Sequence, residues 1–386
     1  MVSQAEEDAT TIPETPEPET LTTLSAWGGN RDGQLGNGTT ADSSTPVQVS
    51  DLVGVRGAAG GQGHSLALKD DGKVWGWGRY PGNTDSSTPV QVTDPNDPSG
   101  YLSGVQAVAA RYSHALALKN DGTVWAWGGN DHGELGNGTT AFSSTPVQVT
   151  DPNDPSGYLS GVRAIAASGY HSQALKNDGT VWAWGANFYG QLGNGTTTNS
   201  STPVQVSGLD GIEAIAAGAG ESHSLALRND GTVWAWGSNA VAARRRISGQ
   251  LGREDITESS TPVEVGNLDG VEAIAAGYCH SLALKDDGTV WAWGLNLMGV
   301  LGTGTTYEHS STPVQVSEVG GIETIAAGDV HSLALKNDGT VWAWGGNRDG
   351  QLGNGTTADS STPVQVSDLG GVKAIAAGQS HSLAVQ

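Results

Sequence analysis

The amino-acid sequence predicts an all-β fold, a seven-bladed β-propeller with four-stranded blades. Three observations predict it: one motif recurs along the chain, its copies are evenly spaced, and one copy is split between the two ends. The motif His residues are separated by 50, 57, 52, 57, 51 and 50 residues. These residues are His64, His114, His171, His223, His280, His331 and His381. Units of this length with several short strands each are typical of propellers.

Each unit contains four segments that favour strands. The first is small and apolar, as at Ile274–Ala276, and the second is HSLALK or a close variant. An Asn-Asp-Gly or Asp-Asp-Gly turn follows, which favours a tight hairpin into the third segment, TVWAWG. Its two Trp residues are two positions apart, so they point to one face of the strand. The fourth segment, STPVQV, contains a proline that suits an edge strand.

The two ends of the chain each carry part of one unit. The C-terminal unit stops after HSLAVQ, and the segment Leu21–Trp27 resembles a third strand without its second-strand partner. We therefore expect Leu21–Trp27 to pair with Ser382–Gln386, which closes the ring and removes exposed sheet edges. Residues 20–386 are predicted to form a single propeller domain. Residues 1–19 carry six acidic and no basic side chains, and we expect a disordered, acidic, Pro-rich tail.

Composition excludes several classes of protein. The net charge of −22 disfavours nucleic-acid binding, and no apolar run is long enough for membrane insertion. A single Cys excludes a disulfide scaffold. No unique Ser/His/Asp or Cys/His set suggests catalysis, because the His and Trp residues recur in every unit and are expected to serve packing and hydrogen bonding. We expect no enzyme activity, no catalytic residues and no cofactor other than a calcium ion considered below.

The motifs GGN-x-x-GQLGNG, STPVQV, GV-x-AIAAG, HSLALK and VWAWG resemble the repeat of the regulator of chromosome condensation family. The resemblance covers nearly all of residues 20–386 and implies a seven-bladed propeller. Its core strands are also similar to those of a bacterial member, a propeller-type β-lactamase inhibitor. Members include a nucleotide-exchange factor for the GTPase Ran, ubiquitin-ligase domains and photoreceptors. The near-identical copies resemble bacterial members, which implies a secreted or cell-surface protein, although this chain shows no signal peptide.

An insertion interrupts the fifth unit, where residues 240–248 read AVAARRRIS. Arg244, Arg245 and Arg246 form a basic cluster on an acidic chain, and Ser248 follows them in a pattern that basophilic kinases modify. A solvated loop is one interpretation. The other is a partner contact to a carboxylate or phosphate, which arginine binds with two parallel hydrogen bonds.

Two units share a longer loop, TDPNDPSGYLSGV, that begins at Thr93 and at Thr150. Its oxygen-bearing side chains could hold calcium, and they are equally typical of turns. The candidate ligands are Asp94, Asn96, Asp97, Asp151, Asn153 and Asp154. Tyr101 and Tyr158 end the two loops and are candidate anchors for a partner. The second unit also lacks the GQLGNG segment, which predicts a notch on that rim.

These observations predict a non-enzymatic protein–protein interaction module that displays loops on a rigid scaffold to a protein partner whose identity they do not give. Two alternatives come from the resemblance. One is guanine-nucleotide exchange on a Ran-like small GTPase, and the other is inhibition of an extracellular enzyme such as a β-lactamase.

Overall fold

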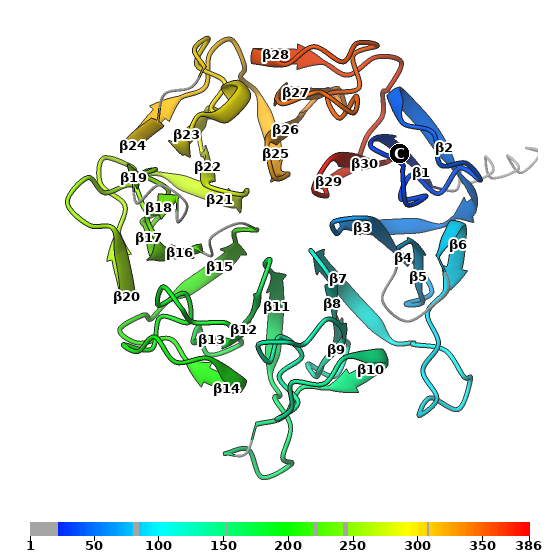
Figure 1. The fold of residues 1–386 in the computed structure, drawn as a ribbon, viewed down its shortest axis with the longest axis vertical. Coiled ribbons are helices and arrows are strands. Elements are labelled where there is room, and N and C mark those ends of the chain that lie inside the picture. Colours follow the sequence, from blue (N-terminus) through cyan, green and yellow to red (C-terminus); the bar gives the residue numbers. More distant parts are fainter. Residues whose placement is uncertain (1–21, 80–84, 152, 220–222, 242–245, 307–308) are drawn as a thin grey trace, which may run out of the picture.

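The computed structural model describes residues 22–386 except 80–84, 152, 220–222, 242–245 and 307–308. The predicted tail, residues 1–19, lies outside this part of the chain. Seven four-stranded antiparallel sheets form a closed ring around a central opening (Figure 1), so the predicted propeller is confirmed.

The first strand of each blade lies nearest the ring axis and the fourth lies at the outer edge. Blade 1 contains β29 (Ala374–Ala377), β30 (His381–Val385), β1 (Thr23–Gly28) and β2 (Ser43–Val53). Blade 2 contains β3 (Val55–Gly60), β4 (His64–Lys69), β5 (Val74–Gly78) and β6 (Ser86–Gln91). Blade 3 contains β7 (Val105–Arg111), β8 (His114–Lys119), β9 (Val124–Gly128) and β10 (Ser143–Gln148). Blade 4 contains β11 (Val162–Ala167), β12 (His171–Lys176), β13 (Val181–Gly185) and β14 (Ser200–Gln205).

The remaining three blades follow the same order. Blade 5 contains β15 (Ile212–Ala217), β16 (His223–Arg228), β17 (Val233–Ser238) and β20 (Glu258–Glu264), with a small hairpin of β18 (Ala240–Val241) and β19 (Arg246–Ile247). Blade 6 contains β21 (Val271–Ala276), β22 (His280–Lys285), β23 (Val290–Leu295), the 3-10 turn η1 (Leu297–Gly299) and β24 (His309–Gln315). Blade 7 contains β25 (Ile322–Ala327), β26 (His331–Lys336), β27 (Val341–Gly345) and β28 (Ser360–Gln365).

Blade 1 closes the ring with strands from both ends of the chain. Strand β1 pairs with β30 in a register that places Leu24 opposite Val385 and Gly28 opposite His381. The expected pairing of the terminal strands is therefore confirmed.

The hydrophobic core lies between neighbouring blades. One cluster joins Leu66 and Val74 of blade 2 to Ala115 and Trp127 of blade 3. The second Trp of every pair, together with Trp27, is fully buried at such a junction, whereas the first, such as Trp125, is only partly buried. The predicted interior role therefore holds in full for the second Trp alone.

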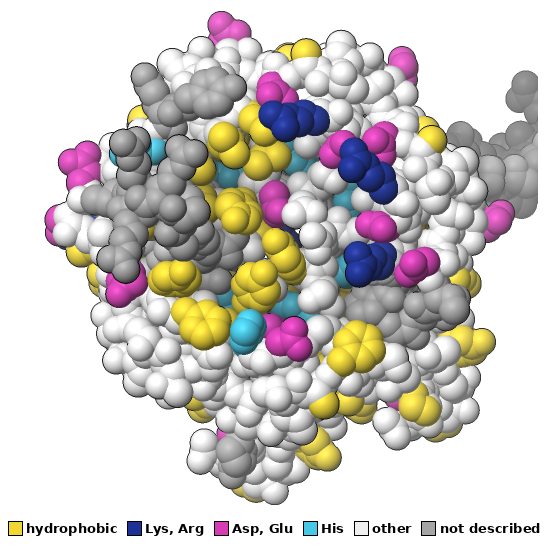
Figure 2. Space-filling model, in the orientation of Figure 1, with side chains coloured by type: hydrophobic (Ala, Val, Ile, Leu, Met, Phe, Trp, Pro, Cys, Tyr) yellow, Lys and Arg dark blue, Asp and Glu magenta, His cyan; other side chains and the backbone are white. Residues whose placement is uncertain are grey.

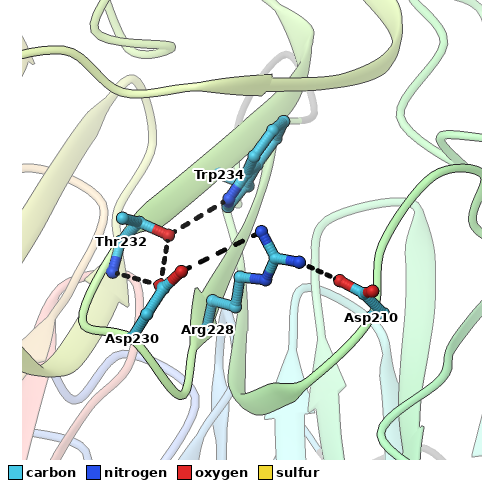
Figure 3. Close-up of polar contacts among 5 residues, drawn as sticks. All are labelled: Asp210, Arg228, Asp230, Thr232 and Trp234. Atoms are coloured by element: carbon cyan, nitrogen blue, oxygen red, sulfur yellow. Dashed lines mark hydrogen bonds and ion pairs between the residues drawn. The ribbon is translucent and has the colours of Figure 1, made fainter.

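The first Trp is held by the hairpin turn. In blade 5 the Asp230 carboxylate accepts hydrogen bonds from the backbone N and the hydroxyl of Thr232, and the Trp234 Nε1 donates to that hydroxyl at 3.3 Å (Figure 3). Arg228 lies between Asp230 and Asp210 and forms ion pairs with both. In five other blades a lysine lies over the first Trp ring, with Nζ 4.5–5.9 Å from the ring centroid. The repeated Asp-Gly-Thr and Lys positions therefore shape this end of each blade.

The repeat His and the Ser that follows it join adjacent blades. Between blades 1 and 2, Ser65 Oγ lies 2.8 Å from His381 Nε2 and donates to the Gln34 carbonyl, which also accepts from Trp77 Nε1 at 2.8 Å. Because the Ser proton is used on the carbonyl, His Nε2 carries the proton that joins His to Ser. A Cβ at Gly61 would collide with the His64 ring, which explains the glycine three residues before that His.

This junction recurs around the ring, with one exception. His–Ser contacts of 2.8–3.3 Å join six of the seven neighbouring pairs of blades. At the seventh, between blades 2 and 3, Ala115 stands where the other blades have Ser. Blade 2 is also the one whose connection between its third and fourth strands lacks the GQLGNG segment, so the Ser and this sequence segment are absent together from the junction.

Burial keeps the ring of His residues neutral. Desolvation lowers the pKa of His64 from 6.5 to about 4, and it lowers the pKa of the other six to about 3. The unfolded chain therefore binds more protons than the folded chain below pH 6.5.

We expect acid to destabilise the propeller by protonating these His residues. Their contribution to the free energy of unfolding should be fully present above pH 6.5 and should be lost as pH falls through the folded-state pKa values, about 4 for His64 and about 3 for the other six. Carboxylates such as Asp97, whose pKa is lowered to about 2, act in a lower window. Urea unfolding over this pH range measures the effect, and a flat profile between pH 6.5 and 4 would contradict it.

We also expect the N-terminal strand to be essential for the closed ring. Deleting residues 1–28 removes β1 and the buried Trp27, and should lower stability by more than about 3 kcal/mol, the loss typical of one large core side chain. Deleting residues 1–18 should leave the melting temperature unchanged. Equal melting temperatures for the two truncations would show that β1 does not close the ring.

Candidate functional site: the channel mouth

Two sets of loops lie on one face of the ring. Because the strands of a blade are antiparallel, the loop between its first and second strands and the loop between its third and fourth strands emerge at the same end. We call this face the channel mouth and define it by an inner and an outer set of residues. The inner set is Gln62, Tyr112, Gly169, Ala219, Tyr278, Asp329 and Gln379. The outer set is Arg31, Asp32, Asp131, His132, Phe188, Tyr189, Leu297, Met298, Arg348 and Asp349.

The channel mouth is where the copies of the repeat differ. The segment STPV of the fourth strand occurs in all seven units, and each third strand keeps both Trp residues outside the terminal unit. The outer set instead differs between blades. In blades 1, 3, 4, 6 and 7 its residues are Arg-Asp, Asp-His, Phe-Tyr, Leu-Met and Arg-Asp, in that order. Figure 2 shows hydrophobic side chains on one side of the central opening and basic and acidic ones on the other. The strands therefore repeat, while this face varies.

A repeated asparagine holds each outer loop in place. Asn30 Oδ1 accepts from the Leu35 backbone N at 2.9 Å, and Asn30 Nδ2 donates to the carbonyls of Thr39 and Ala41. Asn130, Asn187 and Asn347 make the same contacts in blades 3, 4 and 7. The variable side chains are thus displayed on rigid loops, which suits recognition.

A pocket of about 730 Å³ opens in the channel mouth between blades 1, 2 and 3. Seven residues, 79–85, join β5 to β6, whereas fourteen, 129–142, join β9 to β10. The pocket lies beside this shorter connection, where the sequence predicts a notch. Side chains that line it include Arg31, Asp32, Arg79, Tyr112, Asp131 and Phe142.

Comparison with known proteins assigns the family. Residues 81–319 match the RCC1-like domain, and residues 24–68 and 338–385 match the regulator of chromosome condensation (RCC1) repeat. The chain is also 31% identical over 346 residues to the ultraviolet-B receptor UVR8 of Arabidopsis thaliana, covering 86% of this chain and 75% of that receptor. This chain belongs to the RCC1-like propeller family.

This RCC1-like propeller is also similar in sequence to part of a larger protein and similar in fold to a solved structure. It is 32% identical over 346 residues to the human E3 ubiquitin-protein ligase HERC2, covering 86% of this chain but 6% of that ligase. The crystal structure of Prp20p from Saccharomyces cerevisiae matches with a TM-score of 0.80 and 24% identity, over 95% of this chain and 92% of that chain. The Prp20p match shows the fold alone.

The loops with candidate calcium ligands project from the outer edges of blades 2 and 3. In the first loop Asp97 accepts hydrogen bonds from Ser99 and Ser103. In the second loop Asp154 accepts hydrogen bonds from Ser156 and Ser160. These bonds lower the pKa of each Asp to about 2. Asp94 and Asp151 are buried, and each accepts from a backbone N two residues on, that of Asn96 and that of Asn153. No three His, Cys, Asp or Glu residues gather as a metal cluster in the part of the chain that the structure describes. Calcium binding stays a prediction.

The remaining candidate residues of the RCC1-like chain differ in accessibility. Tyr101 and Tyr158 are exposed at the ends of their loops, away from the channel mouth. Arg244 and Arg245 lie outside the described residues, and the backbone of Arg246 belongs to β19. Ser248 is buried, and its hydroxyl donates to the side chain of Gln250, so a kinase does not reach it in this conformation. None of the described residues forms a helix long and apolar enough to cross a membrane.

Sequence reasoning missed one feature of the channel mouth, a buried ion pair between opposite blades. Arg111 of blade 3 contacts blade 7, where its Nη2 lies 3.1 Å from Asp329 Oδ1 and its Nη1 donates to the Ala327 carbonyl. Burial raises the pKa of the Asp329 carboxyl, and the Arg111 guanidinium opposes this shift. Arg111 occupies the position that is glycine in five blades, and this departure was the available signal.

We expect each partner of this ion pair to depend on the other. Arg111→Gly should lower the free energy of unfolding by about 3–5 kcal/mol at neutral pH, because it leaves a buried carboxylate without its counter-charge. Adding Asp329→Gln should recover most of the loss, since Gly and Gln are the native residues at these positions in blades 1 and 2. Urea unfolding of the single and double variants measures this, and additive losses would contradict it.

Proposed function

We propose that this RCC1-like propeller is a non-enzymatic module that binds a protein partner through its channel mouth. One observation carries the proposal: copies of the repeat agree in their strands and differ at residues that gather on this face. If the differences between copies served only the stability of the fold, we would expect them on every face of the propeller. Rigid loops around a pocket also give side chains fixed positions, which reduces the entropy lost when a partner binds.

The absence of a unique reactive set supports the non-enzymatic part of the proposal. The seven repeat His residues are buried at blade junctions, where six of them make contacts of 2.8–3.3 Å with Ser hydroxyls. Cys279 is buried beside His280 at a position that varies between blades. Their burial at the blade junctions supports a structural role for these groups.

Relatives support a role in protein binding. The crystal structure of Prp20p is described together with its binding properties to Gsp1p and histones, and another structure shows yeast RCC1 (Prp20) bound to Kap60. Those statements concern the yeast protein, and the present chain shares its fold at 24% identity. They favour a protein partner over a small-molecule substrate.

We expect changes at the channel mouth to abolish partner binding without unfolding the propeller. The double variant Phe188→Arg with Met298→Asp places residues there that are native at these positions in blades 1 and 7. The full chain and this variant would be used to capture partners from the source organism, with the exposed Tyr158→Ser as a control away from this face. A specific partner should be lost with the double variant alone, and retention would overturn the proposal.

Nucleotide exchange on a Ran-like GTPase is the alternative that the resemblance to the regulator of chromosome condensation repeat implies. We expect no exchange activity, because the net charge of −22 and the altered loops give no match to an exchange wedge. Release of labelled GDP from a Ran-like GTPase should proceed at its intrinsic rate in the presence of the chain. Faster release with catalytic amounts would favour the alternative.

Three further expectations stay predictions. They are docking of an acidic or phosphorylated partner by Arg244–Arg246, inhibition of an extracellular enzyme such as a β-lactamase, and secretion to a bacterial surface. The first would be measured as the affinity for a captured partner after all three arginines are changed to Ala.

A further inference from the structure

We propose that the channel mouth binds a cationic segment of its protein partner, in which a Lys or Arg side chain enters the pocket and a neighbouring apolar side chain lies on a ladder of aromatic rings. This inference rests on the proposed function and names the chemistry of the partner. The aromatic ladder consists of Tyr112, Tyr170, His132 and Phe188, contributed by blades 3 and 4.

The rings of the aromatic ladder touch in sequence. The ring centroids of Tyr112 and Tyr170 are 5.3 Å apart, those of Tyr170 and His132 are 5.7 Å apart, and those of His132 and Phe188 are 5.2 Å apart. The two contacts of His132 are edge-to-face, at 76° and 87°. Such contacts hold the rings in place, and Tyr170 and Phe188 remain 40% and 55% exposed. The ladder is therefore a preorganised aromatic surface.

The placement of phenylalanine points to binding. The chain has only two Phe residues, and both are exposed, Phe142 by 62% and Phe188 by 55%. Phenylalanine is normally among the residues most often buried. Here the core is built from Trp, Leu, Val and Ala, and the two Phe residues lie in the outer loops of adjacent blades. Their exposure on the same face marks an interaction surface.

Phe142 also replaces a residue that stabilises its loop. In blades 1, 4 and 7 the corresponding side chain accepts a hydrogen bond of 2.7–2.8 Å from the backbone N of the loop asparagine. Those acceptors are Asp42, Asn199 and Asp359. A phenyl ring has no acceptor, so blade 3 gives up this bond and gains an exposed ring that lines the pocket. A loss of local stability in return for an exposed ring is typical of binding residues.

The backbone at Tyr112 supports the same interpretation. Tyr112 has φ of 48°, in the left-handed region that costs a non-glycine residue energy. This conformation places its ring against Tyr170 and on the wall of the pocket. Tyr112 is therefore the residue shared by the ladder and the pocket.

The charge around the pocket selects a cationic segment. Asp32, Asp131 and Asp349 line the pocket with Arg31 and Arg79, and Arg31 Nη2 already lies 3.6 Å from Asp349 Oδ1. Acids thus outnumber bases in the pocket, as they do in the whole chain. Aromatic rings attract cations through their π faces, which adds to this preference. The net charge of −22 opposes a second copy of this chain or an acidic segment, and it speeds the approach of a basic partner.

The test uses short fluorescein-labelled peptides with an apolar centre flanked by Lys and Arg, by Asp and Glu, or by Ser and Gln. Binding to the full chain is followed by fluorescence anisotropy as salt is increased. The cationic peptides should bind at least about tenfold more tightly than the other two sets, and salt should weaken their binding. Equal or tighter binding of acidic peptides would overturn the proposal.

Two variants of unchanged net charge separate docking on the ladder and in the pocket from general attraction to an acidic protein. Tyr170→Ser and Phe142→Asn introduce residues native at these positions in other blades, as Ser113, Ser380 and Asn199 show. Each should weaken binding of the cationic peptides at least about tenfold, as the loss of an aromatic anchor does. Tyr158→Ser, a control far from the mouth, should leave binding unchanged. General attraction would leave all three variants equal to the wild type, and that result would also overturn the proposal.

Capture of the partner distinguishes a failure of the cationic proposal from a failure of the proposed function. If the captured partner is lost when the mouth is altered but contacts it through an acidic or neutral segment, the cationic proposal is wrong and the proposed function stands. If the partner is retained by the altered mouth, the proposed function itself is wrong. Thermal melts accompany each variant, and Phe142→Asn should melt no lower than the wild type because Asn can again accept from Asn130 N.

Discussion

At six of the seven blade junctions one backbone carbonyl organises the repeat. The Gln34 carbonyl of blade 1 accepts from both Ser65 Oγ and Trp77 Nε1 of blade 2, while Ser65 accepts from the His381 Nε2 of blade 1. Three separate sequence motifs therefore meet at one buried oxygen. Because every partner is removed from water, loss of any one leaves a buried polar group without its hydrogen bond. This dependence explains why the loop, the His-Ser pair and the second Trp recur together.

The junction between blades 2 and 3 shows the same dependence in reverse. Where the loop after β5 is short, the next blade carries Ala115 in place of Ser. The pocket of the mouth face lies beside this shorter connection. The missing segment, the missing Ser and the pocket therefore occur at the same junction.

The molecule divides its residues between two tasks. Strand residues repeat because each faces the same neighbours in every blade, whereas the residues of the channel mouth lie in loops and vary from blade to blade. The Arg111–Asp329 ion pair joins the two groups, because Arg111 is the last residue of strand β7 and Asp329 belongs to the channel mouth. It joins blades 3 and 7, and both of its side chains are buried.

Much of this structure follows from the sequence alone. Repeat length, hairpin turns and the split terminal unit determined the number of blades, the four strands and the pairing of β1 with β30, because these features are local or follow from periodicity. The notch at blade 2 was equally visible as a missing segment. The sequence did not distinguish the fully buried second Trp from the partly buried first Trp, because side chains two positions apart point to the same face of a strand.

Only the tertiary structure decided which residues meet across blades. Arg111 and Asp329 are separated by most of the ring in sequence, and nothing in their local patterns pairs them. The aromatic ladder likewise joins loops of two blades, and the exposure of both Phe residues depends on which face each loop occupies. Periodicity determines the blade because its contacts are repeated and short in range. The candidate site consists of residues that depart from the repeat, and only the closed ring places these residues close to one another.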